Sequence, residues 1–213
     1  MSKTATETMP DECRSLTPLT CRAYGEHMAR SPRVQIPGGI YHVTTRGNRR
    51  QEIFKTDEDR QCFLNLLAGV VPRFGWRCHA YCLMRNHYHV LIETPEANLS
   101  AGMHLLNGRY AQLFNETHQL DGHLFQGRFR SALVESNWHL IQLSRYIVLN
   151  PVRAVLCPRP DDWRWSSYRA ATAAEPVPTF LTIDWLLVQF DHDAVRARES
   201  FQEFVDAALL PRP

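Results

Sequence analysis

The chain has 213 residues, of which 44% are hydrophobic and 22% are charged, and it carries a formal net charge of +2. This composition is typical of a soluble globular protein, and no stretch reaches the roughly 18 uninterrupted apolar residues that a membrane span requires. The first residues lack a basic flank followed by an apolar run, so the sequence indicates no secretory signal and predicts a cytoplasmic protein.

Residues 1–35 contain several prolines and no regular period, and we expect a poorly ordered N-terminal arm. Beyond them, strand and helix patterns alternate along the chain. Runs of apolar, aromatic and β-branched residues predict strands over 40–45, 76–84, 87–93 and 129–135. Apolar residues at helical spacing predict helices over 57–72, 99–114 and 138–150.

The order β-α-β-β-α-β is that of the ferredoxin-like arrangement, in which helices cover one face of an antiparallel sheet. The predicted fold class is therefore α+β, with a further helix after the last strand. We assign residues 36–172 to this domain and residues 173–213 to a linker and a helical C-terminal tail. Apolar residues at helical spacing over 183–210, together with acidic charge, predict that this tail packs on the domain or on a partner.

Charge is distributed unevenly along the chain. Residues 40–153 carry more basic than acidic side chains, and nearly all of the bases are arginine, whereas residues 161–213 carry more acids than bases. Arginine suits phosphate and base edges, but a high arginine content can also follow genome composition, so it permits nucleic-acid binding without predicting it. The six cysteines are irregularly spaced, which predicts neither a disulfide framework nor a structural zinc site.

The most informative motif is the run NHYHVLI at residues 86–92. Because successive strand side chains alternate between faces, His87 and His89 point the same way and Tyr88 points to the opposite face. Two imidazoles in this position could chelate one divalent ion. Taken alone, the pair is equally compatible with two solvent-facing histidines on a half-buried strand.

A third group comes from the helix predicted over 138–150. Tyr146 and Asn150 are four residues apart and so share one helical face, which can lie against the sheet face that carries the histidines. A cation held by two imidazoles and an amide oxygen keeps open positions for the oxygens of a scissile phosphate, with Tyr146 as the nucleophile. The alternatives are a tyrosine packed in the core and an asparagine that ends a helix before Pro151.

Tyr110 is the competing nucleophile. It lies on the apolar stripe of the helix predicted over 99–114, and no ligand-type side chain follows it one turn later, as Asn150 follows Tyr146. We therefore interpret Tyr110 as a core or DNA-facing residue.

Several ordered segments resemble a known family. They are GIYHVTTRGN at 39–48, NHYHVLI at 86–92, GHLFQGRF at 122–129 and YIVLNPVRA at 146–154, with WSSY at 165–168 in addition. Together they are similar to the IS200-like transposases, and most similar to the subgroup of REP-associated tyrosine transposases. The resemblance covers residues 36–170.

This resemblance implies a fold, a site and a reaction. His87 and His89 match the metal ligands of the HUH motif. Tyr146 matches the single catalytic tyrosine, and Asn150 matches the third metal-binding position. The family implies Mg²⁺ or Mn²⁺ and cleavage of single-stranded DNA beside folded hairpins through a 5′-phosphotyrosine. Members often work as dimers, so a homodimer is an expected assembly, and the sequence gives no sign of whether the tyrosine acts in cis or in trans.

Expected DNA contacts come mainly from loop arginines, which can hold phosphates and read exposed base edges. For any one of them a solvated surface position is an equally good interpretation, so the cluster carries the argument. The candidates are Arg46, Asn48, Arg49, Arg50, Arg128, Arg130 and Arg153. Side chains that could stack on bases are His123, Phe125 and Tyr168.

Three functions are compatible with these observations. A metal-dependent endonuclease and strand-transferase that acts at hairpin or palindromic repeat DNA fits the whole set best. The second is a non-catalytic DNA-binding protein that represses repeat elements. The third, a histidine-triad nucleotide hydrolase, needs another alternating histidine at the position where the chain has Leu91.

Overall fold

The computed structural model describes residues 35–209, so nearly all of the expected N-terminal arm lies outside the described residues. Four strands form one antiparallel sheet in the order β2-β3-β1-β4, and they are β1 Gly39–Arg46, β2 Arg77–Leu83, β3 His87–Thr94 and β4 Arg130–Leu133. The longer helices are α1 Asp57–Arg73, α2 Leu99–His118, α3 Asn137–Val148 and α7 Ala194–Asp206. Short helical turns are η1 Asn48–Arg50, α4 Asn150–Arg153, η2 Pro160–Asp162, α5 Tyr168–Ala171 and α6 Asp184–Leu187. The predicted α+β class is confirmed.

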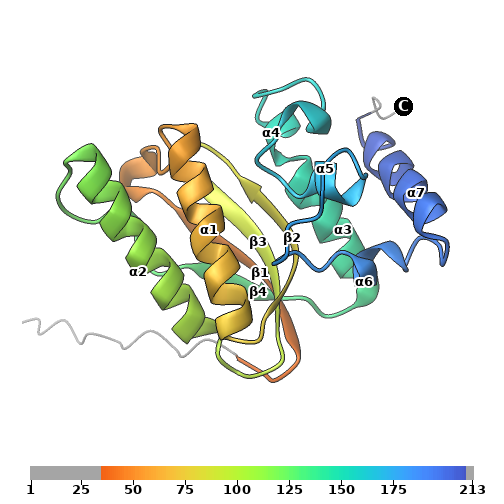
Figure 1. Cartoon of the computed structure of the whole chain (residues 1–213), viewed down its shortest axis with the longest axis horizontal. Coiled ribbons are helices and arrows are strands. Elements are labelled where there is room, and N and C mark those ends of the chain that lie inside the picture. The colour runs from red at the N-terminus through yellow and green to blue at the C-terminus, as the bar shows by residue number, and fades with distance from the viewer. Residues whose placement is uncertain (1–34, 210–213) are drawn as a thin grey trace, which may run out of the picture. The chain divides into compact units, whose positions relative to one another are not determined.

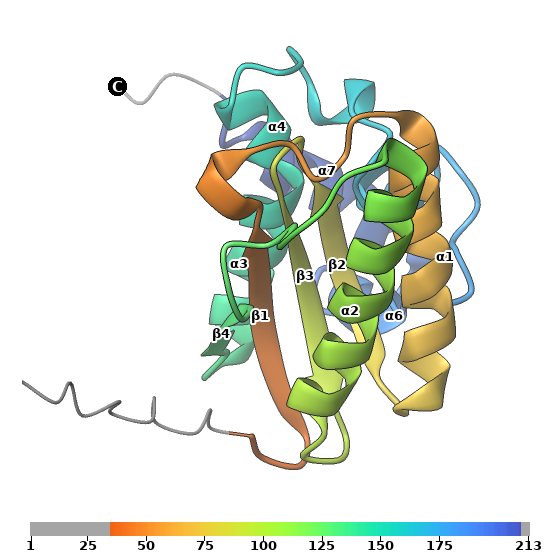
Figure 2. The same cartoon turned by 90° about the vertical axis from the view of Figure 1, so that its left-hand side faces the viewer.

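The sheet lies between two layers of helices (Figure 1), with α1 and α2 on one side and α3 and α7 on the other. Figure 2 shows β4 at one edge beside β1, and β2 on the far side of β3. Because the chain places α3 directly after the edge strand β4, this helix can return across the face that α1 and α2 leave open. It contacts both β2 and β3 there.

The start of α1 follows from its sequence. The Thr56 hydroxyl accepts a hydrogen bond from the Asp59 backbone N–H at 3.3 Å, and the Asp59 carboxylate accepts one from the Thr56 N–H at 3.0 Å. This reciprocal capping satisfies backbone donors that the first helical turn cannot satisfy itself.

Strand alternation separates the core from the second sheet face. Tyr41, Val43 and Thr45 of β1 are buried toward α1 and α2, and Tyr88 of β3 is buried with them. The Tyr88 ring lies 4.5 Å from that of Phe63 on α1. The alternate residues of β1 and β3 therefore face α3, and these include both histidines of the 86–92 motif.

The outer edge of β2 is covered by chain from the C-terminal third. Leu83 donates its backbone N–H to Trp165 O at 2.8 Å, and Ser167 donates to Tyr81 O at 3.0 Å. Further along, Thr182 donates to Cys78 O at 2.7 Å. An edge strand that is paired in this way presents few free backbone groups to other chains.

The helical spacing over 183–210 corresponds to two helices within the described residues, α6 and α7. The Asp193 carboxylate accepts hydrogen bonds from the Val195 and Arg196 backbone N–H groups at 3.1 and 3.0 Å and thereby starts a new helix. β4 is also shorter than the predicted 129–135. None of the helices between residues 35 and 209 is long and apolar enough to cross a membrane.

Candidate active site

His87 and His89 lie on the α3 face of β3, on the same side as the alternation predicts. Their ring centroids are 5.1 Å apart, with an angle of 79° between the planes. His89 is 6% exposed, whereas His87 is half-buried. Both side chains point away from the core that contains Tyr88.

A third histidine, which no motif in the sequence had singled out as a site residue, belongs to this cluster. The His42 Nε2 atom on β1 lies 2.9 Å from the His89 Nδ1 atom, and the two rings stack with centroids 5.1 Å apart. Asn86 was also missed as a site residue, although its side-chain oxygen lies 2.7 Å from His87 Nδ1. The sequence does contain a signal for His42. Along the strand predicted over 40–45 it alternates with Tyr41 and Val43, so its side chain points to the opposite face of the sheet from theirs.

All three imidazoles are held in the neutral form. Burial lowers the pKa of His89 to about 3, with further contributions from His42, His87 and Arg46. Burial, with the nearby His139, lowers the pKa of His42 to about 4. Burial, with the Arg46 guanidinium, lowers the pKa of His87 to about 4. Neutral imidazole is the form that can give a lone pair to a cation.

Tyr146 projects from α3 onto this cluster. Its ring centroid is 5.7 Å from that of His89 and 6.0 Å from that of His42, in edge-on geometry. The side chain remains 37% exposed, so solvent or a ligand can reach it. The guanidinium of Arg153, the last residue of the short helix α4, lies 5.1 Å from the centre of the tyrosine ring. One chain therefore brings the tyrosine and the histidines together without a second copy.

Asn150 lies at the start of α4, just beyond the end of α3. Its side-chain Nδ2 donates to the Tyr146 carbonyl at 2.8 Å, and within residues 35–209 it makes no hydrogen bond with His87 or His89. Helix α3 ends at Val148, within two residues of the end predicted before Pro151. Pro151 itself occupies the first turn of α4, where its missing N–H costs nothing. The described residues contain no group of three or more His, Cys, Asp and Glu side chains that could hold a metal ion.

The basic residues after β1 lie beside the histidines. Arg46 pairs with His87 in the strand register and is exposed, and Arg49 and Arg50 are exposed in η1. Asn48 is half-buried, and its backbone N–H donates to Leu124 O at 2.8 Å. The loop after α2 is thus joined to the basic segment, which is formed by Arg46, Arg49 and Arg50. This loop carries the exposed Arg128, and the exposed Arg130 begins β4.

Two predictions about tyrosines have different outcomes. Tyr110 is 1% exposed and donates its hydroxyl to the Ile53 carbonyl, which agrees with a core position. The prediction that Tyr168 stacks on bases is wrong, because the side chain is completely buried beside Phe201. The WSSY segment is held against the edge of β2, and this places Tyr168 in the interior. His123 is exposed and Phe125 is half-buried.

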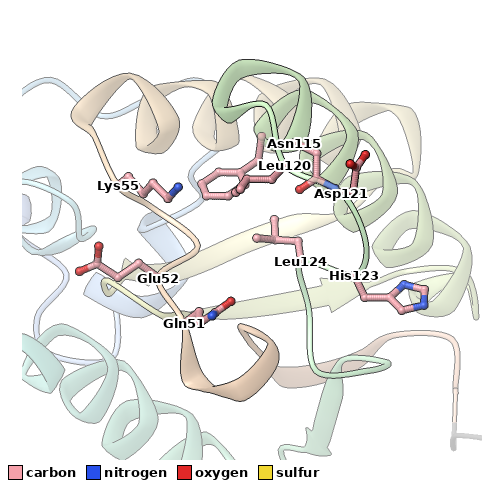
Figure 3. A pocket seen from close by; sticks show the side chains of 9 residues that line it. Gln51, Glu52, Lys55, Asn115, Leu120, Asp121, His123 and Leu124 are labelled. Atoms are coloured by element: carbon pink, nitrogen blue, oxygen red, sulfur yellow. The ribbon is translucent and has the colours of Figure 1, made fainter.

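A pocket of about 380 Å³ lies beyond the basic segment, between the chain that follows η1 and the loop after α2 (Figure 3). The Lys55 ammonium lies 5.5 Å from the centre of the Phe114 ring in this pocket. His42, His87, His89 and Tyr146 are not among its lining residues. Its lining residues are Gln51, Glu52, Lys55, Phe114, Asn115, Leu120, Asp121, His123 and Leu124.

Comparison with known proteins agrees with the resemblance in the motifs. A curated relative, the putative REP-associated tyrosine transposase of Haemophilus influenzae, is 24% identical over 159 residues, which cover 70% of this chain and 88% of the relative. A solved structure of a REP-associated tyrosine transposase bound to a REP hairpin has a TM-score of 0.59 and 20% identity, and it covers 73% of this chain and 92% of that chain. This structural likeness supports the fold.

The family model for the IS200-like transposases matches residues 36–150. That range includes the sheet, both histidines of the motif and Tyr146, and it covers more than half of the chain. The chain therefore belongs to the family of IS200-like transposases.

Proposed function

We propose that this transposase is a metal-dependent endonuclease and strand-transferase, which acts on single-stranded or hairpin DNA through a 5′-phosphotyrosine at Tyr146. The observation that carries this proposal is the position of Tyr146. Its partly exposed ring lies 5.7 Å from His89, on the face where His87 and His89 sit together. A nucleophile and a pair of metal-ligating side chains thus converge at one surface.

The proposed reaction is a transesterification at phosphorus. The bond from the Tyr146 phenol oxygen to phosphorus forms while the bond from phosphorus to the 3′ oxygen of the DNA breaks. The phenol loses its proton, and the departing 3′ oxygen gains one. A later attack by a DNA 3′-hydroxyl on the phosphotyrosine restores the diester and frees Tyr146, so the linkage supports strand transfer. The Arg153 guanidinium beside the ring can balance the charge of the phosphate.

His87 and His89 are the proposed ligands of Mg²⁺ or Mn²⁺, and Asn150 is the proposed third ligand. The fit is supported by the His89 Nε2 atom, which is buried and has no hydrogen-bond partner within residues 35–209. Because Asn150 already donates its Nδ2, its side-chain oxygen is the atom available to a cation. A bound divalent ion supplies polarisation of the phosphate oxygens.

The proposed DNA path follows the basic segment beside the site. The exposed arginines of this segment are Arg46, which ends β1, and Arg49 and Arg50, which follow in η1. The adjoining loop carries Arg128, and Arg130 begins β4. The solved relative binds a REP hairpin, which supports a folded DNA substrate here. Since Tyr146 reaches the histidines of its own chain, the proposed chemistry does not require the expected homodimer.

Replacement of Tyr146 tests the proposal directly. Incubation of the full chain with labelled hairpin oligonucleotides and Mn²⁺ should give a protein–DNA adduct that survives denaturing electrophoresis. In Tyr146→Phe the adduct should fall by about 10³-fold or more, because the nucleophilic oxygen is absent. Tyr110→Phe should keep the adduct, since Tyr110 lies in the core. An adduct that persists in Tyr146→Phe would show that another group is the nucleophile.

The same experiment distinguishes the proposed nuclease from the alternative function. A DNA-binding protein without catalysis is favoured by one observation, the exposed arginines around η1, which can bind phosphate whether or not the site reacts. Tight hairpin binding with no adduct under either Mg²⁺ or Mn²⁺ would support that alternative and contradict the nuclease.

A further inference from the structure

His87 and His89 both contact the protein through the Nδ1 atom. The His87 Nδ1 atom lies 2.7 Å from the Asn86 side-chain oxygen, and the His89 Nδ1 atom lies 2.9 Å from His42 Nε2. A neutral imidazole carries one N–H and one lone pair, so the hydrogen bond at Nδ1 decides what Nε2 can do. Only an imidazole with its proton on Nδ1 can offer Nε2 to a cation.

The tautomer of His87 follows from the orientation of Asn86. The Asn86 Nδ2 atom donates to the Arg50 carbonyl at 3.0 Å, and this leaves the amide oxygen to face His87. An amide oxygen accepts and cannot donate. His87 must therefore carry its proton on Nδ1, and its Nε2 keeps a lone pair.

The pair formed by His42 and His89 has two arrangements. If His42 donates, His89 carries its proton on Nε2, which is then a buried donor with no acceptor within the described residues. If His89 donates, its Nε2 carries a lone pair instead, so that buried atom is not an N–H donor without an acceptor. The second arrangement is favoured because an unmet buried donor is costly.

We propose that Asn86 and His42 are positioning residues, which fix the tautomers of His87 and His89 so that both Nε2 atoms face a divalent cation. This inference rests on the proposed function, since it assumes that the two histidines bind a metal. Partners of this kind are known to set ring orientation and tautomer at metal sites, and their loss weakens metal binding by about 10-fold to 100-fold. Neither residue is proposed to touch DNA or the reacting phosphate.

Nitrogen-15 NMR of the metal-free full chain tests the tautomers without any reaction. Long-range couplings between ring protons and nitrogens distinguish an Nδ1–H imidazole from an Nε2–H imidazole. The expected result is that His87 and His89 are both of the Nδ1–H form at neutral pH. An Nε2–H form of either histidine in the folded protein would overturn the proposal for its partner.

Matched variants test whether the partners are the cause. His42→Phe keeps a ring that can stack on His89 but removes the acceptor, whereas His42→Gln keeps an acceptor. Asn86→Leu and Asn86→Asp form the corresponding pair for His87. We expect the Phe and Leu variants to move His89 or His87 toward the Nε2–H form and to weaken Mn²⁺ binding by about 10-fold to 100-fold, as followed by electron paramagnetic resonance of free Mn²⁺. The Gln and Asp variants should stay within a few-fold of the wild type.

Unchanged tautomers and unchanged Mn²⁺ affinity in His42→Phe and Asn86→Leu would overturn the proposal, provided that thermal melting shows both variants to be folded. If either variant does not fold, the NMR result on the unmodified chain decides. The outcomes also separate this inference from the proposed function. Normal tautomers and Mn²⁺ binding without any Tyr146 adduct would contradict the nuclease alone, whereas an adduct with the opposite tautomers would contradict the positioning role alone.

Discussion

Arg49 and Arg50 adopt left-handed backbone conformations, with φ angles of 52° and 62°, in the turn that follows β1. Residues other than glycine rarely adopt this conformation, and each instance costs on the order of 1–3 kcal/mol unless the surroundings impose it. Here the turn directs the Arg50 carbonyl to Asn86 while both guanidinium groups stay exposed. The strain is thus located where the proposed DNA path meets the site.

Arg49→Asn should weaken hairpin binding by removing one charge, and asparagine tolerates the left-handed conformation, so the turn should persist. If Arg49 contacts a phosphate, the slope of log K against log salt should become shallower by about 0.7 to 1. Fluorescence anisotropy of a labelled hairpin over a salt series measures this slope. The control is Arg77→Gln, because Arg77 pairs with Glu93 at the opposite end of β3. Identical slopes for Arg49→Asn and the wild type would exclude the contact.

The sequence predicted the pair of histidines but not its partners. Alternation along one strand is local, so the common direction of His87 and His89 can be read from a few residues. The contact between His42 and His89 depends on the register of β1 against β3, and these residues are 47 positions apart in the chain. No local pattern contains that register. The roles of His87, His89, Tyr146 and Asn150 remain predictions.

At the scale of elements, two glycines of α2 occupy opposite environments. A Cβ atom on Gly102 would lie 2.2 Å from Cζ2 of the Trp76 ring, whereas one on Gly108 would meet nothing within 4 Å. Trp76 is 4% exposed and donates its Nε1–H to the Asn98 side-chain oxygen at 2.6 Å, so its ring has little freedom to move. Gly102 is therefore required where α2 approaches Trp76, and Gly108 is not required by packing.

Gly102→Ala should lower the free energy of unfolding by about 1–3 kcal/mol, because the added methyl group overpacks a filled core. The same change in the same helix, Gly108→Ala, should raise it by about 0.5–1 kcal/mol, because alanine loses less backbone entropy in a helix. Urea denaturation followed by circular dichroism measures both. Equal effects of the two substitutions would contradict the packing of α2 against Trp76.

Element types were more predictable than element ends. Helix α1 begins at Asp57, as the predicted range 57–72 has it, and its start is set by a local interaction, the cap at Thr56. The helical spacing over 183–210 gave no boundary within that segment, since apolar spacing persists across Asp193 although that residue starts a new helix. Helix α3 ends at Val148, close to the predicted end before Pro151, whereas the short helix α4 was not predicted, because proline is compatible with the first turn of a new helix.

At the scale of the whole described chain, residues 35–209, the C-terminal helices share a core with the rest. Phe201 on α7 is 1% exposed and contacts the rings of Tyr168 and Phe190. The Arg145 guanidinium on α3 lies 4.1 Å from the centre of the Phe204 ring. The helix that carries Tyr146 is therefore packed between the sheet and α7. The order of elements predicted the sheet, whereas this second layer depends on contacts between distant segments.

Phe201→Ala should lower the free energy of unfolding by about 3–5 kcal/mol, because it opens a cavity beside Tyr168. Since α7 shares the core, we expect one cooperative urea transition with a lower midpoint. Val195→Ala on the same helix is the control, and it should change the midpoint little because Val195 is 65% exposed. A separate early transition in Phe201→Ala, with the main midpoint unchanged, would show that the tail is an independent unit.

The hydrogen bond from Asn86 to the Arg50 carbonyl also has a thermodynamic consequence. It connects a loop that is proposed to bind DNA with a side chain that is proposed to orient a metal ligand. If DNA stabilises the loop conformation that this bond requires, DNA raises the affinity for the cation. Because such coupling is reciprocal, the cation then raises the affinity for DNA by the same factor. We therefore expect substrate and metal to bind this transposase cooperatively.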